Sequence, residues 1–156
     1  MRKRLITPTQ EIIQTRGESL LDLERVAVVE FTSEDREYPI ESAFVSGNAR
    51  GWRAAVAGVQ TIRLIFDPPQ NLTCISFLFE ENETARTQEF VLRWSADSEE
   101  TKEIVRQQWN FSPPDTIREV EEYRVQLSAV TVLALVINPD INGGNARASL
   151  KSFRIC

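Results

Sequence analysis

The segments "TIRLIFD" (residues 61–67) and "LTCISFLFE" (72–80) decide the fold class of this chain. In the first segment, apolar residues occupy every second position from Ile62 to Phe66, which is the period-two pattern of a half-buried strand. The second segment is apolar on both faces, as expected of a central strand. Residues 68–71, which begin with two prolines, predict a turn between the segments. The sequence therefore predicts two consecutive β-strands here.

Strand-like segments dominate the chain from residue 26 onward. The others are "QEFVLRWS" (88–95), "EYRVQL" (122–127), "VTVLALVINP" (130–139) and "ASLKSFRI" (148–155). Helical periodicity is confined to residues 9–24, where Gly17 interrupts it, so a short helix and an extended lead-in fit equally well. We predict one all-β domain, an antiparallel β-sandwich or barrel over residues 26–156, with residues 1–25 as an N-terminal lead-in packed on it.

Composition and charge limit the class of protein. The chain has 156 residues, of which 42% are hydrophobic and 26% charged, and this suits a single globular domain. Its formal net charge of −5 argues against non-specific nucleic-acid binding, which needs a basic surface. No stretch approaches a membrane span, and the basic start "MRKRLITPTQ" (1–10) is not followed by the apolar segment of a signal peptide. We therefore expect a cytoplasmic protein that does not bind membranes.

The histidine and cysteine content excludes several chemistries. The chain has no histidine, which rules out Ser–His–Asp and Cys–His catalysis and makes a zinc site unexpected. The two cysteines, Cys74 in an apolar run and Cys156 at the last position, do not make a disulfide framework. We predict that both are reduced thiols, in keeping with a cytoplasmic location.

Several segments, taken together in their order, carry a family resemblance. They are "VAVVEFTSEDREYPIESAF" (26–44), "GWRAA" (51–55), "QTIRLIFDPPQNLTCISFLF" (60–79), "EFVLRWSADSEE" (89–100) and "TVLALVINPDINGGNARASLKSFRI" (131–155). This succession resembles the discoidin (coagulation factor V/VIII type C) branch of the galactose-binding-domain-like jelly rolls. The resemblance implies an eight-stranded jelly-roll sandwich whose loops at one end bind sugars, lipids, peptides or proteins, without catalysis.

The chain departs from the pattern of that family in two places. Family members often hold a structural calcium near an Asp-Gly turn, but "FVSGNARG" (44–51) has no aspartate. Since calcium needs several oxygen ligands, the lost carboxylate weakens such a site, and we expect no cofactor. The family's common disulfide between the two termini is also missing, because Cys156 has no N-terminal cysteine to pair with. Both departures fit an intracellular relative.

Trp52 and Arg53 are the first candidates for ligand binding. Turn residues precede them, among them Gly51, so a large side chain could be displayed at a loop tip. A Trp face stacks on apolar sugar faces, and Arg supplies planar donors to hydroxyls or carboxylates. The alternative is that Trp52 plugs the end of the sandwich while Arg53 forms a surface ion pair.

Three further candidates come from two later segments. In "RQQWNFSPP" (106–114), Gln107 and Trp109 lie on one strand face, which suits either recognition of a polar ligand or tethering of the loop that follows. "ETARTQ" (83–88) is predicted to form an inter-strand loop. From this loop, the Arg86 side chain would face the same ligand-binding end of the sandwich as Trp52 and Arg53. We predict that these three side chains share a cleft with the first two candidates.

Oxygen-bearing residues occur in two other places where metal binding or hydrolysis is conceivable. In "NPDINGGNA" (138–146), Asp140 and Asn142 could be cation ligands, but Asn-Gly is the standard signal of a hairpin turn, and the turn is the favoured interpretation. The glutamates in 80–83 and 119–122 could supply a paired-carboxylate hydrolase only if two of them faced each other across a cleft. Neighbouring glutamates are usually solvated, so we do not expect an enzyme.

Two functional hypotheses follow from these observations. The first is a non-catalytic module that recognises a carbohydrate-like or other polar ligand through loops at one end of the sandwich. The second is a protein–protein interaction or assembly module, in which a sandwich face pairs with another chain, for example in a homodimer. A continuous exposed apolar face would favour the second hypothesis.

Overall fold

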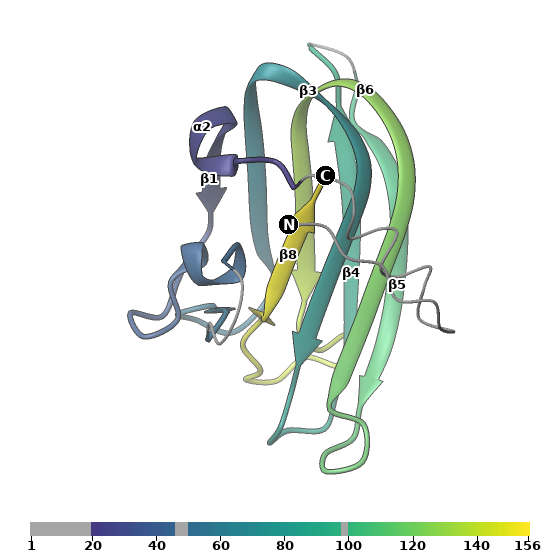
Figure 1. The fold of residues 1–156 in the computed structure, drawn as a ribbon. Coiled ribbons are helices and arrows are strands. Elements are labelled where there is room, and N and C mark those ends of the chain that lie inside the picture. The colour runs from purple at the N-terminus through teal and green to yellow at the C-terminus, as the bar shows by residue number, and fades with distance from the viewer. Residues whose placement is uncertain (1–19, 46–49, 98–99) are drawn as a thin grey trace, which may run out of the picture.

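The computed structural model describes residues 20–45, 50–97 and 100–156, which form a two-layered β-sandwich (Figure 1). Its strands are β1 (Ala27–Phe31), β2 (Trp52–Arg53), β3 (Gln60–Glu80), β4 (Arg86–Ser95), β5 (Lys102–Phe111), β6 (Arg118–Asn138), β7 (Ser149–Leu150) and β8 (Ser152–Ile155). The helical segments are α2 (Leu23–Val26) and the 3₁₀ turn η1 (Ile40–Ala43). Within these ranges, no helix is long and apolar enough to cross a membrane.

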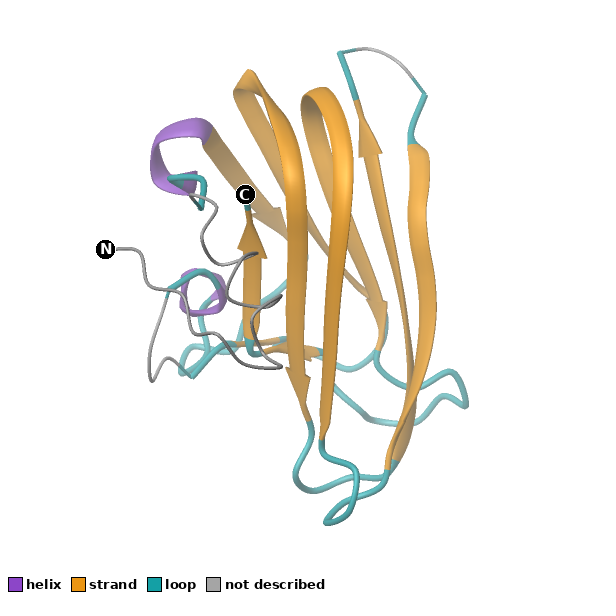
Figure 2. Ribbon diagram, turned by 45° about the vertical axis from the view of Figure 1, so that its right-hand side comes forward, coloured by secondary structure: helices purple, strands orange, loops and turns teal. Residues whose placement is uncertain are grey.

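The two longest strands, β3 and β6, contribute to both layers of the sandwich. Residues 60–65 of β3 pair antiparallel with residues 132–137 of β6, and residues 72–80 pair with residues 118–127. Between these two blocks the register shifts, and both strands bend from one layer into the other (Figure 2). The sandwich is therefore held together by continuous backbone as well as by side-chain packing.

The turn predicted at residues 68–71 is wrong, because β3 continues through that segment. Pro68 and Pro69 cannot donate to the ladder, so regular pairing lapses there without a reversal of the chain. The pairing resumes because β6 bends at the same level, next to Ala129 with its φ of 54°. For the same reason, the segments predicted as separate strands at 122–127 and 130–139 are both parts of β6.

The strand order completes the two layers. One layer contains β1, the first part of β3, the second part of β6, β4 and β5, in that order. The other contains β8, the second part of β3 and the first part of β6. β2 and β7 form a separate two-stranded sheet. This arrangement is the all-β antiparallel sandwich that the sequence predicts.

The core consists of the inward-facing alternate residues of both layers. Ile62, Leu64 and Phe66 are all buried, as the alternation in 61–67 predicts. Across the layers, the ring of Phe77 in β3 lies 5.5 Å from that of Phe90 in β4. Burying a side chain of this size contributes about 1.5–3 kcal/mol, so these rings are a main link between the layers.

Four loops meet at one end of the sandwich, which we call the loop end (Figure 1). They follow β1, β3, β5 and β6. A backbone hydrogen bond from Glu81 N–H to the carbonyl of Ile117 (2.8 Å) joins the loops after β3 and β5, and one from Ile141 N–H to the carbonyl of Thr87 (2.8 Å) ties the loop after β6 to the start of β4. The loop end thus gathers residues that are far apart in the sequence.

The prediction of two reduced thiols is wrong, because Cys74 and Cys156 form a disulfide. β8 pairs antiparallel with β3, with Ile155 opposite Ile75, so the register places Cys156 opposite Cys74. The chain spacing of 82 residues gave no sign of this contact, which the fold alone creates. Since disulfides persist in oxidising compartments, the cysteines no longer support the predicted cytoplasmic location. That location stays a prediction.

The predicted N-terminal lead-in is described only from residue 20. Most of residues 1–25, and most of the helical periodicity in 9–24, lie outside the described residues. In the described part, the Leu21 N–H donates to the carbonyl of Ile155 (3.0 Å), and the single turn α2 leads into β1. The division into 1–25 and 26–156 remains a prediction.

Candidate functional site

A cleft of about 440 Å³ opens at the loop end. The residues that line it are Tyr38, Arg50, Trp52, Arg53, Glu80, Asn82, Ser149 and Lys151. They come from the loop after β1, from β2 and the residues before it, from the end of β3 and the loop after it, and from β7 with the residue that follows it. All of these segments belong to the end at which the family resemblance implies ligand binding.

The small sheet of β2 and β7 positions one wall of the cleft. Trp52 pairs with Leu150, and Arg53 pairs with Ser149. Gly51 has a φ of +79°, and a Cβ there would lie 2.7 Å from the carbonyl oxygen of Leu150. Only glycine therefore allows the two backbones to approach so closely, and this approach places Arg50, Arg53 and Lys151 around the same cleft.

Trp52 forms the floor of the cleft and is not displayed at a loop tip. Its side chain is 1% exposed, and its Nε1–H donates to the carbonyl of Ser33 (2.9 Å). Of the two alternatives left open by the sequence, the structure shows the plug. Because the indole is buried and hydrogen-bonded, it supports the wall rather than offering a free face for stacking.

The guanidinium groups of Arg50 and Arg53 lie over the ring of Tyr38. Their Cζ atoms are 5.9 Å and 4.7 Å from its centroid, respectively. The Arg53 N–H also donates to the carbonyl of Tyr38 (3.2 Å), which ties β2 to this loop. Within the described part of the chain, neither arginine forms an ion pair with a carboxylate. The surface ion pair that the plug alternative gave to Arg53 is therefore not found there.

The lining of the cleft also carries hydroxyl, amide and carboxylate groups. The Glu80 carboxylate lies 3.4 Å from Arg118 Nε, so its charge is partly compensated. The Ser149 hydroxyl donates to the carbonyl of Glu80 (3.4 Å), and the Lys151 N–H donates to the carbonyl of Leu78 (2.8 Å). With Asn82, these groups offer both donors and acceptors to a polar ligand.

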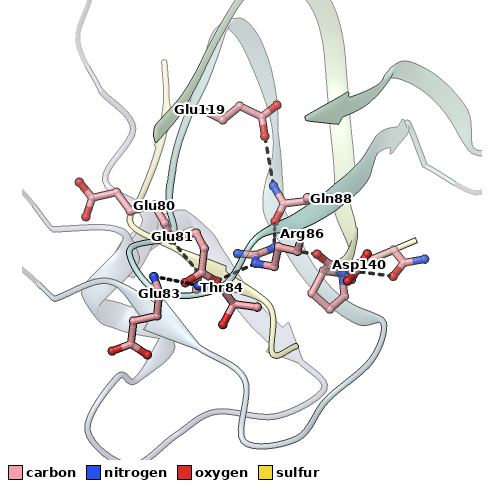
Figure 3. A network of polar contacts seen from close by, with 11 residues as sticks. Glu80, Glu81, Glu83, Thr84, Arg86, Gln88, Glu119 and Asp140 are labelled. Carbon is pink, nitrogen blue, oxygen red and sulfur yellow. Dashed lines mark hydrogen bonds and ion pairs between the residues drawn. The ribbon is translucent and has the colours of Figure 1, made fainter. Parts of the chain in front are cut away.

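Arg86 does not lie in a loop, so the prediction that residues 83–88 form one is wrong. β4 begins at Arg86, which pairs with Phe111 of β5. Its side chain is fully buried, and Nε lies 2.7 Å from the carboxylate of Glu81 (Figure 3). Nη1 donates to Gln88 Oε1 (3.1 Å) and to the carbonyl of Pro139 (2.8 Å). Through these contacts the guanidinium joins three segments of the loop end, while its Nη2 is buried without a hydrogen-bond partner.

Glu81 and Arg86 form a partly buried ion pair. Burial alone would raise the pKa of Glu81, but the hydrogen bond from Arg86 and those from the Glu83 and Thr84 N–H groups lower it overall. The Glu81 carboxylate therefore stays ionised at pH values below those at which a glutamate usually takes up a proton. The ion pair with Arg86 stabilises the fold at neutral pH.

A chain of interior polar groups continues from Arg86 between the layers (Figure 3). Gln88 donates to Glu119 Oε1 (3.2 Å), and Glu119 is completely buried. Burial and the neighbouring Glu121 carboxyl raise the pKa of Glu119 to about 9. Glu119 is therefore protonated at neutral pH. The Tyr123 hydroxyl donates to Glu121 (2.5 Å) at the far end of this chain.

Gln107 and Trp109 lie on β5 and do not line the cleft. Gln107 is exposed opposite Phe90, whereas Trp109 is half-buried opposite Gln88 and packs against the core. The five candidates therefore do not share one cleft. Trp52 and Arg53 line the cleft, whereas Arg86, Gln107 and Trp109 belong to β4 and β5. A binding role for these last three stays a prediction.

Asp140 and Asn142 use their polar atoms within a turn. The Asn142 N–H donates to Asp140 Oδ1 (3.1 Å), and the Gly143 N–H donates to the Asp140 carbonyl (3.0 Å). In the ranges that the structure describes, no group of three or more His, Cys, Asp or Glu residues could hold a metal ion. These bonds form a turn, but the predicted hairpin is wrong, because the flanking strands β6 and β7 pair with other strands and not with each other.

Sequence reasoning missed several residues of the cleft, above all Tyr38, Asn82 and Lys151. Tyr38 stands in "DREYP" (35–39), in the first loop of the resemblance, and Asn82 follows the strand that ends at Glu80. Both loops could have been searched, because the resemblance implies binding at this end. Nothing in the local sequence marks Lys151, which reaches the cleft only through the pairing of β7 with β2.

Comparison with solved structures finds the same fold in carbohydrate-binding modules. No protein-family model matches the chain, and no curated protein sequence matches it. The family 32 module of NanJ from Clostridium perfringens, in complex with galactose, is 12% identical over 83% of this chain and 92% of that one, with a TM-score of 0.59. The family 32 module of AlyQ, in complex with 4,5-unsaturated mannuronic acid, is 15% identical over 89% and 98%, with a TM-score of 0.60.

A third structure, a family 32 module of the Clostridium perfringens protein CpGH89 in complex with GalNAc-β-1,3-galactose, is 16% identical over 88% of this chain and 99% of that one, with a TM-score of 0.62. At these identities the comparisons show the fold. They confirm the discoidin-like jelly-roll fold that the sequence resemblance predicts.

Proposed function

We propose that this chain is a non-catalytic module that binds a saccharide in the cleft at the loop end. The observation that carries the proposal is the cleft itself, an open space of about 440 Å³ whose walls present two arginines, a lysine, an amide, a hydroxyl and a carboxylate. The shared fold supports it, because the modules of NanJ and CpGH89 are in complex with galactose-containing sugars and that of AlyQ with a uronic acid derivative.

The chemistry of the walls suits a ligand that is rich in hydroxyl groups. Each sugar hydroxyl both donates and accepts hydrogen bonds, so a sugar site needs both kinds of partner. Asn82 supplies both, Glu80 accepts, and Lys151 donates. Trp52 holds its wall in a fixed position because it is buried and hydrogen-bonded. A wall that is fixed in this way does not have to be ordered when a ligand binds.

The carboxylates support binding rather than hydrolysis. Glycoside hydrolysis in most families uses two carboxyl groups that flank the bond to be cleaved. Among the described residues that line this cleft there is a single carboxylate, Glu80, which is paired with Arg118. Glu119, the carboxyl with the raised pKa, is completely buried between the layers and does not line the cleft.

No specific observation favours the alternative of a protein-interaction module. The large apolar side chains that are exposed in the described ranges are spread over several segments, among them Val28 and Phe31 on β1, Val56 and Val59 before β3, Val120 on β6 and Ile141 after it. Apolar residues scattered over a surface are normal in monomeric proteins, whereas an interface needs a continuous patch.

Two amide variants of the full chain test the location of the site. We expect a panel of neutral and acidic monosaccharides and disaccharides, titrated by calorimetry, to contain at least one ligand that binds saturably. Asn82→Ala removes an amide from the cleft, and Gln107→Ala removes a matched, exposed amide from β5. We expect Asn82→Ala to weaken binding about tenfold and Gln107→Ala to leave it unchanged.

The reverse result would place the site on β5 and overturn the proposal. So would the absence of binding to every sugar in the panel. Incubation of each bound disaccharide with the protein should release no monosaccharide, and release of sugar would show that the module is an enzyme.

A further inference from the structure

We infer that the saccharide bound in the cleft is acidic, meaning that a carboxylate or sulfate group on the sugar lies against Arg50, Arg53 and Lys151. This inference rests on the proposed function and names the class of sugar. It goes beyond the shared fold, because it depends on which side chains this particular chain places around the cleft.

The charge of the cleft is opposite to that of the chain as a whole. Three cations, Arg50, Arg53 and Lys151, and one anion, Glu80, are among the residues that line it. The formal charge of the lining is therefore +2, whereas the chain carries −5. A positive cleft on a negative protein attracts an anionic ligand selectively, because the rest of the surface repels it.

The cations of the cleft differ from many others because they lack a carboxylate partner. Elsewhere, Arg63 pairs with Glu30 at 2.8 Å and Arg106 pairs with Glu89 at 3.1 Å. In the described ranges, no such pair involves Arg50, Arg53 or Lys151. An acidic ligand would therefore meet these charges without displacing an internal ion pair.

The ring of Tyr38 orders the two guanidinium groups before any ligand binds. Arg53 lies 4.7 Å and Arg50 lies 5.9 Å from its centroid. Cation–π contact leaves the N–H edge of a guanidinium free, and that planar edge matches the two oxygens of a carboxylate or sulfate. Lys151 adds a flexible point charge on the neighbouring segment.

The remaining polar groups favour an acidic sugar over a polyanion. Glu80 would repel a chain of closely spaced phosphates, and the negative charge of the protein would repel it further. Next to hydroxyl groups, in contrast, Glu80 and Asn82 have hydrogen bonds to make. A single anionic group surrounded by hydroxyls satisfies both parts of the lining.

The experiment compares sugars that differ only in the acidic group. The full chain is titrated by calorimetry with methyl glycosides of galactose and galacturonic acid, glucose and glucuronic acid, and mannose and mannuronic acid, and with methyl galactoside 6-sulfate. We expect an acidic sugar to bind at least tenfold more tightly than its neutral counterpart. The preference should weaken as sodium chloride is raised from 0.05 M to 0.5 M, because salt screens the attraction. Whichever acid binds more tightly, carboxylate or sulfate, identifies the anionic group.

Three charge-removing variants locate the effect. We expect Arg53→Gln and Lys151→Gln each to weaken binding of the acidic sugar about tenfold while changing that of the neutral sugar less than twofold. Arg93→Gln is the matched control, because Arg93 lies on β4, outside the cleft, near Glu103 (3.9 Å). It should change neither affinity.

The outcomes separate this inference from the proposed function. If neutral and acidic sugars bind equally and Asn82→Ala weakens both, the module binds saccharides but the inference of an acidic sugar is wrong. The inference also fails if Arg93→Gln weakens binding as much as the cleft variants do, since the effect would then be one of overall charge. If no sugar binds, the proposed function and the inference fail together.

Discussion

Two arginines at the loop end have the same aromatic contact and different surroundings. Arg53 lies 4.7 Å from the centroid of Tyr38, and Arg86 lies 4.7 Å from that of Phe111. Arg86 is fully buried and bonded to Glu81, whereas Arg53 is half-buried and has no carboxylate partner in the described ranges. The aromatic contact therefore does not tell which arginine is available to a ligand. The burial of the side chain and the presence of a partner carboxylate distinguish the two arginines in this respect.

The difference follows from the cost of burying a charge. A guanidinium in the interior is tolerated only when an ionised partner and further acceptors compensate for the lost water. Arg86 meets this condition through Glu81, Gln88 and the carbonyl of Pro139. Arg86 is fully buried and does not line the cleft, so it serves the fold. Arg53 keeps contact with water and can exchange it for a ligand.

The largest expected effect separates the two arginines by stability. Arg86→Ala should lower the free energy of unfolding by about 3–5 kcal/mol, because it leaves Glu81 and Gln88 without their buried partner. Arg53→Ala should lower it by no more than about 1 kcal/mol. Urea unfolding followed by tryptophan fluorescence measures both. Equal losses in the two variants would abolish the distinction.

The next effect concerns Glu119 and has the opposite dependence on pH from an ordinary carboxylate. Its folded-state pKa of about 9 lies above the unfolded value, so the folded state binds the extra proton and loses stability as pH rises between the two values. Glu119→Gln cannot titrate. Relative to the native chain, the variant should gain about 2 kcal/mol between pH 6 and pH 8, measured by urea unfolding. A pH-independent difference would show that Glu119 is ionised in the fold.

Glu81 should show the reverse dependence with a smaller effect. Its pKa is lowered in the folded state, so its contribution to stability is present at neutral pH and is lost as pH falls through the folded-state pKa. Glu81→Gln should therefore cost about 1–2 kcal/mol at pH 7 and less in acid. Unfolding curves from pH 7 down to pH 3 test this, and a constant cost would assign the effect to packing.

The smallest effect is expected at the surface near the cleft. Arg147 lies 3.4 Å from Asp35, and both side chains are partly exposed. Arg147→Gln should change the free energy of unfolding by less than about 0.5 kcal/mol. A loss as large as that of Glu81→Gln would mean that the exposed pair matters to the fold as much as the interior one.

The fold could be predicted because its signal is local. Alternation in 61–67 marks the inner face of β3, and Ile62 and Leu64 are buried as expected. The course of β3 past Pro68 could not be predicted, since it depends on β6 bending beside it. A proline pair signals only that regular pairing lapses, and the partner strand decides whether the chain turns back.

The candidate site was less predictable than the fold because long-range pairing assembles it. Arg53 could be predicted from the turn residues that precede it in the sequence. Lys151, in contrast, lines the cleft only because Ser149, two residues before Lys151, pairs with Arg53. The polar sequence around Arg86 suggests a loop, and this is why its place was predicted wrongly. Its interior position depends on the ion pair with Glu81, five residues earlier, which the local sequence does not reveal. Which of two arginines is buried is settled by packing between the layers.

The disulfide described above also has a mechanical meaning. β8 contacts β3 over only four paired residues, and without a covalent link a pull on residue 156 would peel it away one hydrogen bond at a time. The bond to Cys74 carries that tension past β8 into β3, which is paired with β6 over most of its length. A force applied to residue 156 is then resisted by the hydrogen bonds between β3 and β6, and no longer by those of β8 alone.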